Sequence, residues 1–175
     1  MVKIKKAIFF DRDGTLIKTF VSKNNKPIAI RKLKDFRLIK NTKLVIKKLS
    51  KKYLIIVITN QPDVSRGKNK KINVININNK LKKFLNINKI YTCYSHDDKN
   101  YMRKPNPGMI FSAKKKFKLN LKKCFVIGDR GKDIKCGKKA GCKTVLLKKK
   151  YNDSKFSNPD FVIKDFKELL NIIKV

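Results

Sequence analysis

The sequence feature that most restricts the fold is a series of short, continuous apolar runs. The first run covers residues 4–10 and ends at Asp11, and further runs lie at 53–58, 89–94, 124–127, 143–147 and 160–163. An apolar run without polar alternation is typical of a strand that is buried on both faces of a sheet. The runs therefore predict a sheet inside the molecule.

The segments between these runs have a helical pattern. Apolar side chains recur at helical spacing within 44–52, 70–85, 107–117, 132–140 and 166–173. Strands that alternate with helices predict an α/β fold, here a three-layer, Rossmann-like parallel sheet flanked by helices. Residues 18–37 are irregular and predict a flap or small hairpin, and residues 148–158 predict a surface loop. No segment has the length of a cap domain, so we expect residues 1–175 to form one domain without a cap.

The charge of the chain raises the question of a polyanionic partner. Lys and Arg number 47 against 12 Asp and Glu, which gives a formal net charge of +35, and 41 of the basic residues are Lys. A nucleic-acid site would gather basic residues on one face and use Arg to read bases. The bias toward Lys runs through the whole chain and is typical of compositional drift. We therefore do not expect nucleic-acid binding to be the main function.

The acidic residues are rare, and four of the twelve form two tight pairs. They are Asp11 with Asp13, and Asp129 with Asp133. Each pair follows a predicted strand, as do four of the six arginines, which are Arg12, Arg66, Arg103 and Arg130. Carboxylates concentrated in this way in a basic chain indicate a metal site.

Polar clusters stand at the carboxyl ends of four predicted strands. They cover residues 11–15, 59–61, 103–105 and 128–133. In an open α/β sheet, ligands bind beyond the carboxyl ends of the strands. We therefore expect the four clusters to converge in space on one site.

The residue types in these clusters favour phosphoryl transfer. The carboxylates of Asp11 and Asp129 are hard oxygen ligands that suit Mg²⁺. The metal and Lys104 would neutralise a phosphate attacked by Asp11, and Thr59 would donate a hydrogen bond to a phosphoryl oxygen. An aspartyl-phosphate intermediate divides one difficult hydrolysis into two steps. Asp13 would protonate the leaving group and later activate the water.

The same clusters resemble the four motifs of the haloacid dehalogenase superfamily of phosphatases. Residues 10–16 resemble its first motif, and the later clusters match the other three in order and spacing over essentially the whole chain. The resemblance implies that Asp11 is nucleophile and metal ligand and that Asp13 is acid and base, with a backbone carbonyl on the metal. It also implies that Asp129 is the second metal carboxylate and that Asp133 orients Lys104 or a metal-bound water.

Within the superfamily the chain is similar to the capless branch that includes D-glycero-D-manno-heptose 1,7-bisphosphate 7-phosphatase and histidinol-phosphatase. This similarity rests on residues 59–67, 103–109 and 128–133, and it implies that Asn60, Arg66, Arg103 and Lys104 face the substrate. The expected substrate is a small phosphorylated metabolite, first of all the 7-phosphate of the heptose bisphosphate. Histidinol phosphate and a nucleic-acid 3′-phosphate are the alternatives, and a basic nucleic-acid-binding module is the non-enzyme alternative.

The chain departs from this branch at two places. Members commonly hold a structural zinc in the loop before the third motif, with a Cys-x-His element and a later pair of cysteines. Here the loop keeps at most Cys93 and His96. Because two ligands do not make a stable tetrahedral site, we predict that zinc is absent. The second departure is Pro62-Asp63, where Ser-Gly is more usual; it borders the pocket and leaves the catalytic set intact.

Some of these residues have simpler explanations. Asp133 would also serve as a cap of the helix that follows it, and Arg66 would also suit a solvated surface. Arg12 and Arg130 are expected to make structural contacts rather than catalytic ones.

The remaining predictions concern the setting of the protein. The four cysteines have no paired spacing, which favours a reducing compartment and therefore the cytoplasm. No apolar run reaches transmembrane length, so we expect no membrane contact. No long apolar surface stripe stands out, and we expect a monomer.

Overall fold

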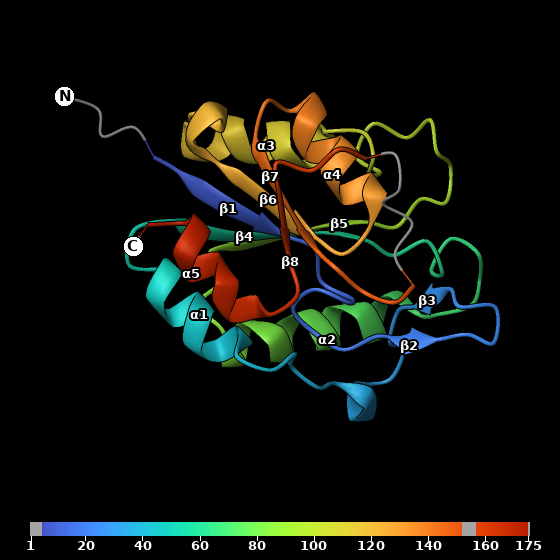
Figure 1. Cartoon of the computed structure of the whole chain (residues 1–175). Helices are drawn as coiled ribbons and strands as arrows, with labels where there is room; N and C mark the ends of the chain where they lie inside the picture. Colours follow the sequence, from blue (N-terminus) through green and yellow to red (C-terminus); the bar gives the residue numbers. More distant parts are fainter. Residues whose placement is uncertain (1–4, 152–156, 175) are drawn as a thin grey trace.

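A six-stranded, fully parallel sheet forms the centre of the molecule (Figure 1). The computed structural model describes residues 5–151 and 157–174. The strand order is β5-β4-β1-β6-β7-β8. The strands are β1 (Ala7–Phe10), β4 (Leu54–Asn60), β5 (Lys89–Cys93), β6 (Phe125–Gly128), β7 (Lys143–Leu147) and β8 (Phe161–Ile163). The predicted α/β fold with a parallel sheet is confirmed.

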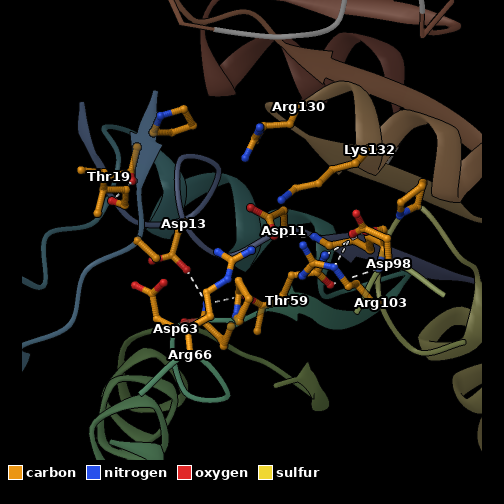
Figure 2. A pocket seen from close by; sticks show the side chains of 18 of the residues that line it. Asp11, Asp13, Thr19, Thr59, Asp63, Arg66, Asp98, Arg103, Arg130 and Lys132 are labelled. Atoms are coloured by element: carbon orange, nitrogen blue, oxygen red, sulfur yellow. Dashed lines mark hydrogen bonds and ion pairs between the residues drawn. The ribbon is translucent and has the colours of Figure 1, made fainter. Parts of the chain in front are cut away.

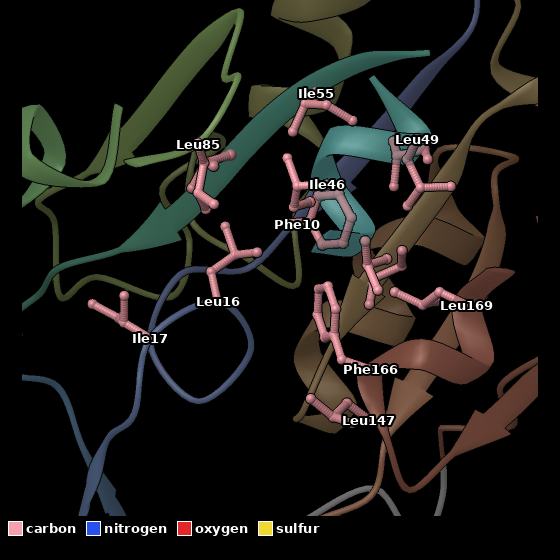
Figure 3. Close-up of a cluster of buried hydrophobic side chains, with 14 of the residues drawn as sticks. Phe10, Leu16, Ile17, Ile46, Leu49, Ile55, Leu85, Leu147, Phe166 and Leu169 are labelled. Carbon is pink, nitrogen blue, oxygen red and sulfur yellow. The ribbon is translucent and has the colours of Figure 1, made fainter. Parts of the chain in front are cut away.

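Helices cover both faces of the sheet, which explains the continuous apolar runs. On one face lie α1 (Thr42–Leu49), α2 (Lys71–Phe84) and α5 (Leu169–Ile172), and on the other lie α3 (Gly108–Phe117) and α4 (Gly131–Lys139). Successive residues of β1 point to opposite faces. Ile8 and Phe10 lie in the core under α1, α2 and α5, here called the first core. Ala7 and Phe9 lie in the second core, under α3 and α4, and all four residues are fully buried. Figure 3 shows Phe10 in the first core, near Phe166.

The strand order places a crevice beside β1. The chain leaves β1 for β4 and β5 and returns to the opposite side of β1 at β6. Such a reversal opens a crevice at the carboxyl ends of the strands. Phe10 is level with Val57 on one side and Ile127 on the other. Asp11, the next residue, therefore stands at the crevice, and its N–H donates to the Ile127 carbonyl at 2.9 Å.

The segment between β1 and α1 carries a small hairpin. Strands β2 (Phe20–Val21) and β3 (Pro27–Ile28) pair antiparallel, and a 3-10 turn, η1 (Leu33–Asp35), follows them. The hairpin lies beside the carboxyl edge of the sheet (Figure 1). The hairpin predicted within 18–37 is confirmed, and the described part of the chain holds no cap domain.

Most element boundaries lie within a few residues of the predicted ones, and three of the differences concern the site or the ends of the chain. Strand β4 runs to Asn60, so that Thr59 and Asn60 end the strand instead of following it. The closing helix is divided into a 3-10 turn, η3 (Phe166–Glu168), and α5. The first strand begins at Ala7, and the start of the predicted strand at residue 4 lies outside the described residues.

The predicted surface loop at 148–158 is described only in part, because residues 152–156 lie outside the described residues. Among the described residues, no helix has both the length and the apolar character needed to cross a membrane.

Candidate active site

A cavity of about 650 Å³ opens at the carboxyl edge of the sheet, at the crevice beside β1. Its volume falls in the range of small-molecule sites. Asp11, Asp13, Thr59 and Lys104 line it together with residues of the hairpin and of the loops after β4 and β6. Figure 2 shows Arg130 and Lys132 on one side of the cavity and Asp13, Asp63 and Arg66 on the opposite side. The predicted convergence of the four polar clusters is confirmed.

Lys104 provides a fixed cation at the bottom of this cavity. Its Nζ lies 2.5 Å from Asp11 Oδ1 and 2.7 Å from Asp133 Oδ1, and it donates to the Ile58 carbonyl at 2.8 Å. Burial alone would lower the pKa of the ammonium. The two carboxylates outweigh burial and raise the pKa of Lys104 above its ordinary value. The side chain is therefore charged and points at Asp11.

Asn60 holds the backbone of Lys104 in place. The Asn60 side chain donates to the Lys104 carbonyl at 2.9 Å and accepts from the Lys104 N–H at 3.1 Å. Both ends of the amide are thus occupied, although Asn60 also lines the cavity. The end of β4 is thereby fastened to the loop after β5. A contact of Asn60 with substrate stays a prediction.

Asp133 combines the two roles that the sequence left open. It lies in the first turn of α4, and its Oδ2 accepts from the Arg130 N–H at 3.1 Å, which caps the helix. Its Oδ1 pairs with Lys104. One buried carboxylate therefore connects the start of α4 to the cation beside Asp11.

Three carboxylates gather next to Lys104. Oxygens of Asp11, Asp129 and Asp133 lie within 4.8 Å of one another, and all three residues are buried. Asp129 accepts hydrogen bonds from the Thr15 hydroxyl and the Tyr151 hydroxyl, each at 2.9 Å. Burial, and then the negative charges of Asp11 and Asp133, raise the pKa of Asp129 to about 7. Such a cluster of hard oxygen donors, with excess negative charge, fits a magnesium ion.

Asp13 is fixed by two neighbours, Arg12 and Gln61. The Arg12 guanidinium, which is fully buried, pairs with Asp13 Oδ2 at 2.9 Å and donates to the Asn78 side chain on α2. Gln61 Nε2 donates to the same Asp13 oxygen at 2.8 Å. The other oxygen, Oδ1, is buried and accepts no hydrogen bond in the described part of the chain. The predicted structural role of Arg12 agrees with these contacts.

Thr59 is held so that its hydroxyl proton is available. Gln61 Nε2 donates to Thr59 Oγ1 at 2.8 Å, so this hydroxyl oxygen acts as an acceptor toward Gln61. A hydroxyl group has one proton and two lone pairs. The bond with Gln61 does not use the Thr59 hydroxyl proton. Thr59 can therefore donate this proton to another acceptor in the cavity.

Positive side chains line the cavity as well. Arg103 lines the wall and is held by Asp98 at 2.8 Å and by the Ser95 carbonyl at 3.2 Å. Arg66, which is exposed, and Lys132, which is half-buried, make no ion pair within the described residues. Burial, and then the charge of Arg130, lower the pKa of Lys132. The cavity can therefore receive an anionic group.

The two residues left from the zinc loop have separate partners. The Cys93 thiol is buried and faces Asn100 Oδ1 at 3.8 Å. His96 Nδ1 lies 2.9 Å from the Ser65 hydroxyl. Asn106 bridges the carbonyls of Asp98 and Asn100, each at 3.0 Å, and so closes the loop.

Two site residues were not predicted from the sequence. Gln61 follows Thr59 by two positions, and this spacing on an extended segment is the signal that was available for it. Tyr151 lies in the segment after β7, at the carboxyl end of the strand next to β6. An aromatic residue in a lysine-rich loop at that edge gives only a weak signal.

The fold and the site together define a haloacid-dehalogenase-like α/β hydrolase, as the sequence motifs indicated. A family model described as "Polynucleotide kinase 3 phosphatase" matches residues 6–167. The chain belongs to this family of the haloacid dehalogenase superfamily.

Comparison with known proteins gives relatives along the whole chain. The chain is 32% identical over 176 residues to D-glycero-alpha-D-manno-heptose-1,7-bisphosphate 7-phosphatase of Campylobacter jejuni, covering 97% of this chain and 96% of that protein. It is also 32% identical over 178 residues to the corresponding beta-heptose enzyme of Helicobacter pylori, with 97% and 98% covered.

Among solved structures, the D,D-heptose 1.7-bisphosphate phosphatase from B. bronchiseptica, complexed with magnesium and phosphate, is similar with a TM-score of 0.78. That match is 21% identical and covers 97% of this chain and 100% of the other. At this level of identity, the match shows that the two proteins share a fold.

Proposed function

We propose that the protein is a magnesium-dependent phosphomonoesterase that removes the 7-phosphate of D-glycero-D-manno-heptose 1,7-bisphosphate. The observation that carries this proposal is the meeting of three charged groups: Asp11 and Lys104 pair at the cavity, and the buried Asp129 carboxylate lies next to Asp11. The named activity of relatives that match along almost the whole chain supports the choice of substrate.

Asp11 and Asp129 would hold the cation with their carboxylates, and Asp13 with its backbone carbonyl. When bound, Mg²⁺ neutralises charge on the phosphate and so lowers repulsion of an attacking carboxylate. Lys104 adds a second positive charge beside Asp11, at 2.5 Å. The free proton of Thr59 suits a phosphoryl oxygen.

The reaction then follows from the positions of the two acids. The Asp11 carboxylate attacks phosphorus, and the bond from phosphorus to the sugar oxygen breaks. Protonated Asp13 gives its proton to that oxygen, and as a carboxylate it next takes a proton from the water that hydrolyses the aspartyl phosphate. Arg12 and Gln61 hold one Asp13 oxygen and so fix the carboxyl group that would make this proton transfer.

The basic lining of the cavity supports a substrate with two phosphates. One phosphate would lie against Asp11 and Lys104. Arg66, Arg103 and Lys132 also line the cavity, where a second anion of the same substrate would gain from their charge. Relatives are named for both the alpha and the beta anomer, so the preferred anomer is left to experiment.

A substrate panel tests the proposal. Phosphate release would be measured with both anomers of the heptose bisphosphate, with histidinol phosphate and with a 3′-phosphorylated oligonucleotide, each with Mg²⁺ and with EDTA. We expect the highest kcat/KM for a heptose bisphosphate, no release in EDTA, and no release by Asp11→Asn. A preference for the oligonucleotide would reject the substrate, and equal activity of Asp11→Asn would reject the mechanism.

Zinc is not part of the proposed enzyme. The separate partners of Cys93 and His96, and the bridging of the loop by Asn106, support a loop that closes without metal. Metal analysis of the purified protein should find zinc far below one ion per chain. A stoichiometric zinc that disappears together with activity on chelation would contradict this.

We also propose that the enzyme is a cytoplasmic monomer. The described cysteines are free and buried, as suits a reducing compartment. Light scattering after size exclusion should give the mass of one chain.

A further inference from the structure

Tyr151 contacts the carboxylate that the fold places opposite Asp11. Its hydroxyl lies 2.9 Å from Asp129 Oδ2. A tyrosine hydroxyl keeps its proton at neutral pH, so it donates and the carboxylate accepts. The contact therefore supplies a hydrogen bond to a charged acceptor, which is the stronger kind.

The two oxygens of Asp129 are held from two different parts of the chain. The Thr15 hydroxyl, from the loop after β1, donates to Oδ1 at 2.9 Å, and Tyr151, from the segment after β7, donates to Oδ2. A carboxylate has about four lone-pair sites. Two such bonds fix the plane of the group and leave one site on each oxygen for a cation.

Gly14 shows how closely Tyr151 approaches. A Cβ at position 14 would lie 2.4 Å from Asp129 Oδ2 and 2.6 Å from the Tyr151 hydroxyl. The hydroxyl thus occupies space that a side chain at position 14 would fill. Gly14 also has a φ of +90°, so two separate requirements call for glycine there.

The segment that carries Tyr151 touches the hairpin. The side chain of Asn25, in the turn between β2 and β3, donates to the Lys150 carbonyl at 3.4 Å. The residue next to Tyr151 is therefore in contact with the hairpin that borders the cavity. Figure 1 shows the segment after β7 extending to the side of the molecule where the hairpin lies.

We propose that Tyr151 is a positioning residue for the metal site, because it orients Asp129 for the divalent cation. This proposal rests on the proposed function in so far as it takes Asp11 and Asp129 as the cation ligands. Mutation of a residue that hydrogen-bonds to a metal ligand commonly lowers metal affinity by about 10- to 100-fold. The Tyr151→Phe variant removes only the hydroxyl and keeps the ring.

The test is direct binding of Mg²⁺ by calorimetry, without substrate, to wild type, Tyr151→Phe and a control, Tyr53→Phe. Tyr53 packs against Phe125 and Lys6, away from the cavity. We expect Tyr151→Phe to bind Mg²⁺ about tenfold more weakly or worse. Tyr53→Phe should bind it as wild type does, and circular dichroism should show the same fold in all three.

Kinetics separate positioning from a general defect. With Tyr151→Phe, the Mg²⁺ concentration for half-maximal activity should rise by the same factor as the dissociation constant. At saturating Mg²⁺, kcat and the KM for substrate should return to near the wild-type values. Equal Mg²⁺ affinity of wild type and Tyr151→Phe would overturn the role of Tyr151 and leave the phosphatase proposal standing. Wild type that does not bind Mg²⁺ at all would overturn both.

Discussion

At the scale of single residues, the site is a cluster of buried charges that are only partly paired. Lys104 is the ammonium that contacts Asp11 and Asp133, while Asp129 receives only hydroxyl donors in the described part of the chain. A buried charge is costly unless it is paired. The metal-free site therefore has a surplus of negative charge, and this surplus has consequences that can be measured.

The first prediction concerns the pH dependence of stability. In the folded, metal-free protein the pKa of Asp129 is about 7, against 3.8 as the ordinary value. The folded state keeps a proton that the unfolded chain has already lost. The resulting stabilisation is complete below about pH 4 and is lost as the pH rises through about 7. In EDTA, the Tm should therefore fall between about pH 5 and about pH 8.

Mg²⁺ should reverse this trend, because the cation competes with the proton for Asp129. The rise in Tm on adding Mg²⁺ should be larger at the higher pH. Asp129→Asn is the control, since it has no carboxylate to titrate. Its Tm in EDTA should depend less on pH and should respond little to Mg²⁺. The same pH slope in both proteins would contradict the assignment.

The second prediction concerns Gln61, whose amide donates to both Asp13 and Thr59. Gln61→Leu keeps the volume at a position that is 2% exposed but removes both donors. A hydrogen bond to a charged group contributes about 1.5–3 kcal/mol, so kcat/KM should fall about tenfold or more. Asn76→Leu, at an exposed amide on α2, is the control and should leave kcat/KM unchanged. An unaltered kcat/KM in Gln61→Leu would show that Asp13 and Thr59 are positioned without Gln61.

The sequence predicted that the polar clusters converge and that Asp133 orients Lys104, but it did not predict the contacts of Gln61 and Tyr151. The meeting of Asp11, Lys104 and Asp129 follows from topology, since parallel strands end at one edge. Contacts such as Tyr151 to Asp129 depend on how a loop turns after β7. No local pattern predicts that turn, which is contacted by Asn25 from a distant part of the sequence.

At the scale of elements, helix α4 joins the core to the site. Gly137 faces the sheet, and a Cβ there would lie 2.7 Å from Thr144 Cγ2 and 2.8 Å from Val126 Cβ. The helix can thus lie close to β6 and β7. Asp133, in the first turn of the same helix, pairs with Lys104. The distance between α4 and the sheet therefore sets the position of the Asp133 carboxylate in the site.

The third prediction is that Gly137→Ala destabilises the protein. Alanine favours a helix over glycine by about 1 kcal/mol, but overpacking commonly costs about 1–3 kcal/mol. The steric clash of the new Cβ with the sheet should outweigh the gain in helix propensity. Urea unfolding should therefore show that the free energy of unfolding falls by about 1 kcal/mol or more. Lys135→Ala, on the exposed face of α4, should change stability by less than about 0.5 kcal/mol. A more stable Gly137→Ala would mean that the helix moves away without loss.

The sequence predicted which elements exist better than where they end. Apolar runs such as 143–147 are read directly from the chain, because both faces of the strand are buried. The extension of β4 through Thr59 and Asn60 follows from pairing with Thr92 and Cys93 on β5. That pairing joins distant segments, so local composition did not indicate it.

At the scale of the whole molecule, the positive charge is spread over both faces of the sheet. Helices α1 and α2 on one face, and α3 and α4 on the other, all carry exposed lysines. This distribution differs from the one-sided patch expected of a nucleic-acid site. It still gives a net field of +35 that attracts phosphate and repels Mg²⁺. The carboxylates of Asp11, Asp129 and Asp133, which lie close together at the site, oppose this repulsion locally.

The last prediction is that this field speeds capture of substrate in proportion to substrate charge. Between about 20 mM and about 300 mM salt, at saturating Mg²⁺, kcat/KM for the bisphosphate should fall several-fold, because salt shortens the reach of the field. A sugar monophosphate is the matched control, and its kcat/KM should fall less because it carries about half the charge. The kcat of both substrates should stay nearly constant, since bound substrate is already inside the cavity. If the two substrates lose kcat/KM equally, salt acts on the enzyme and not on the encounter. If neither loses any, the lysines exert no field at the cavity, and compositional drift alone explains them.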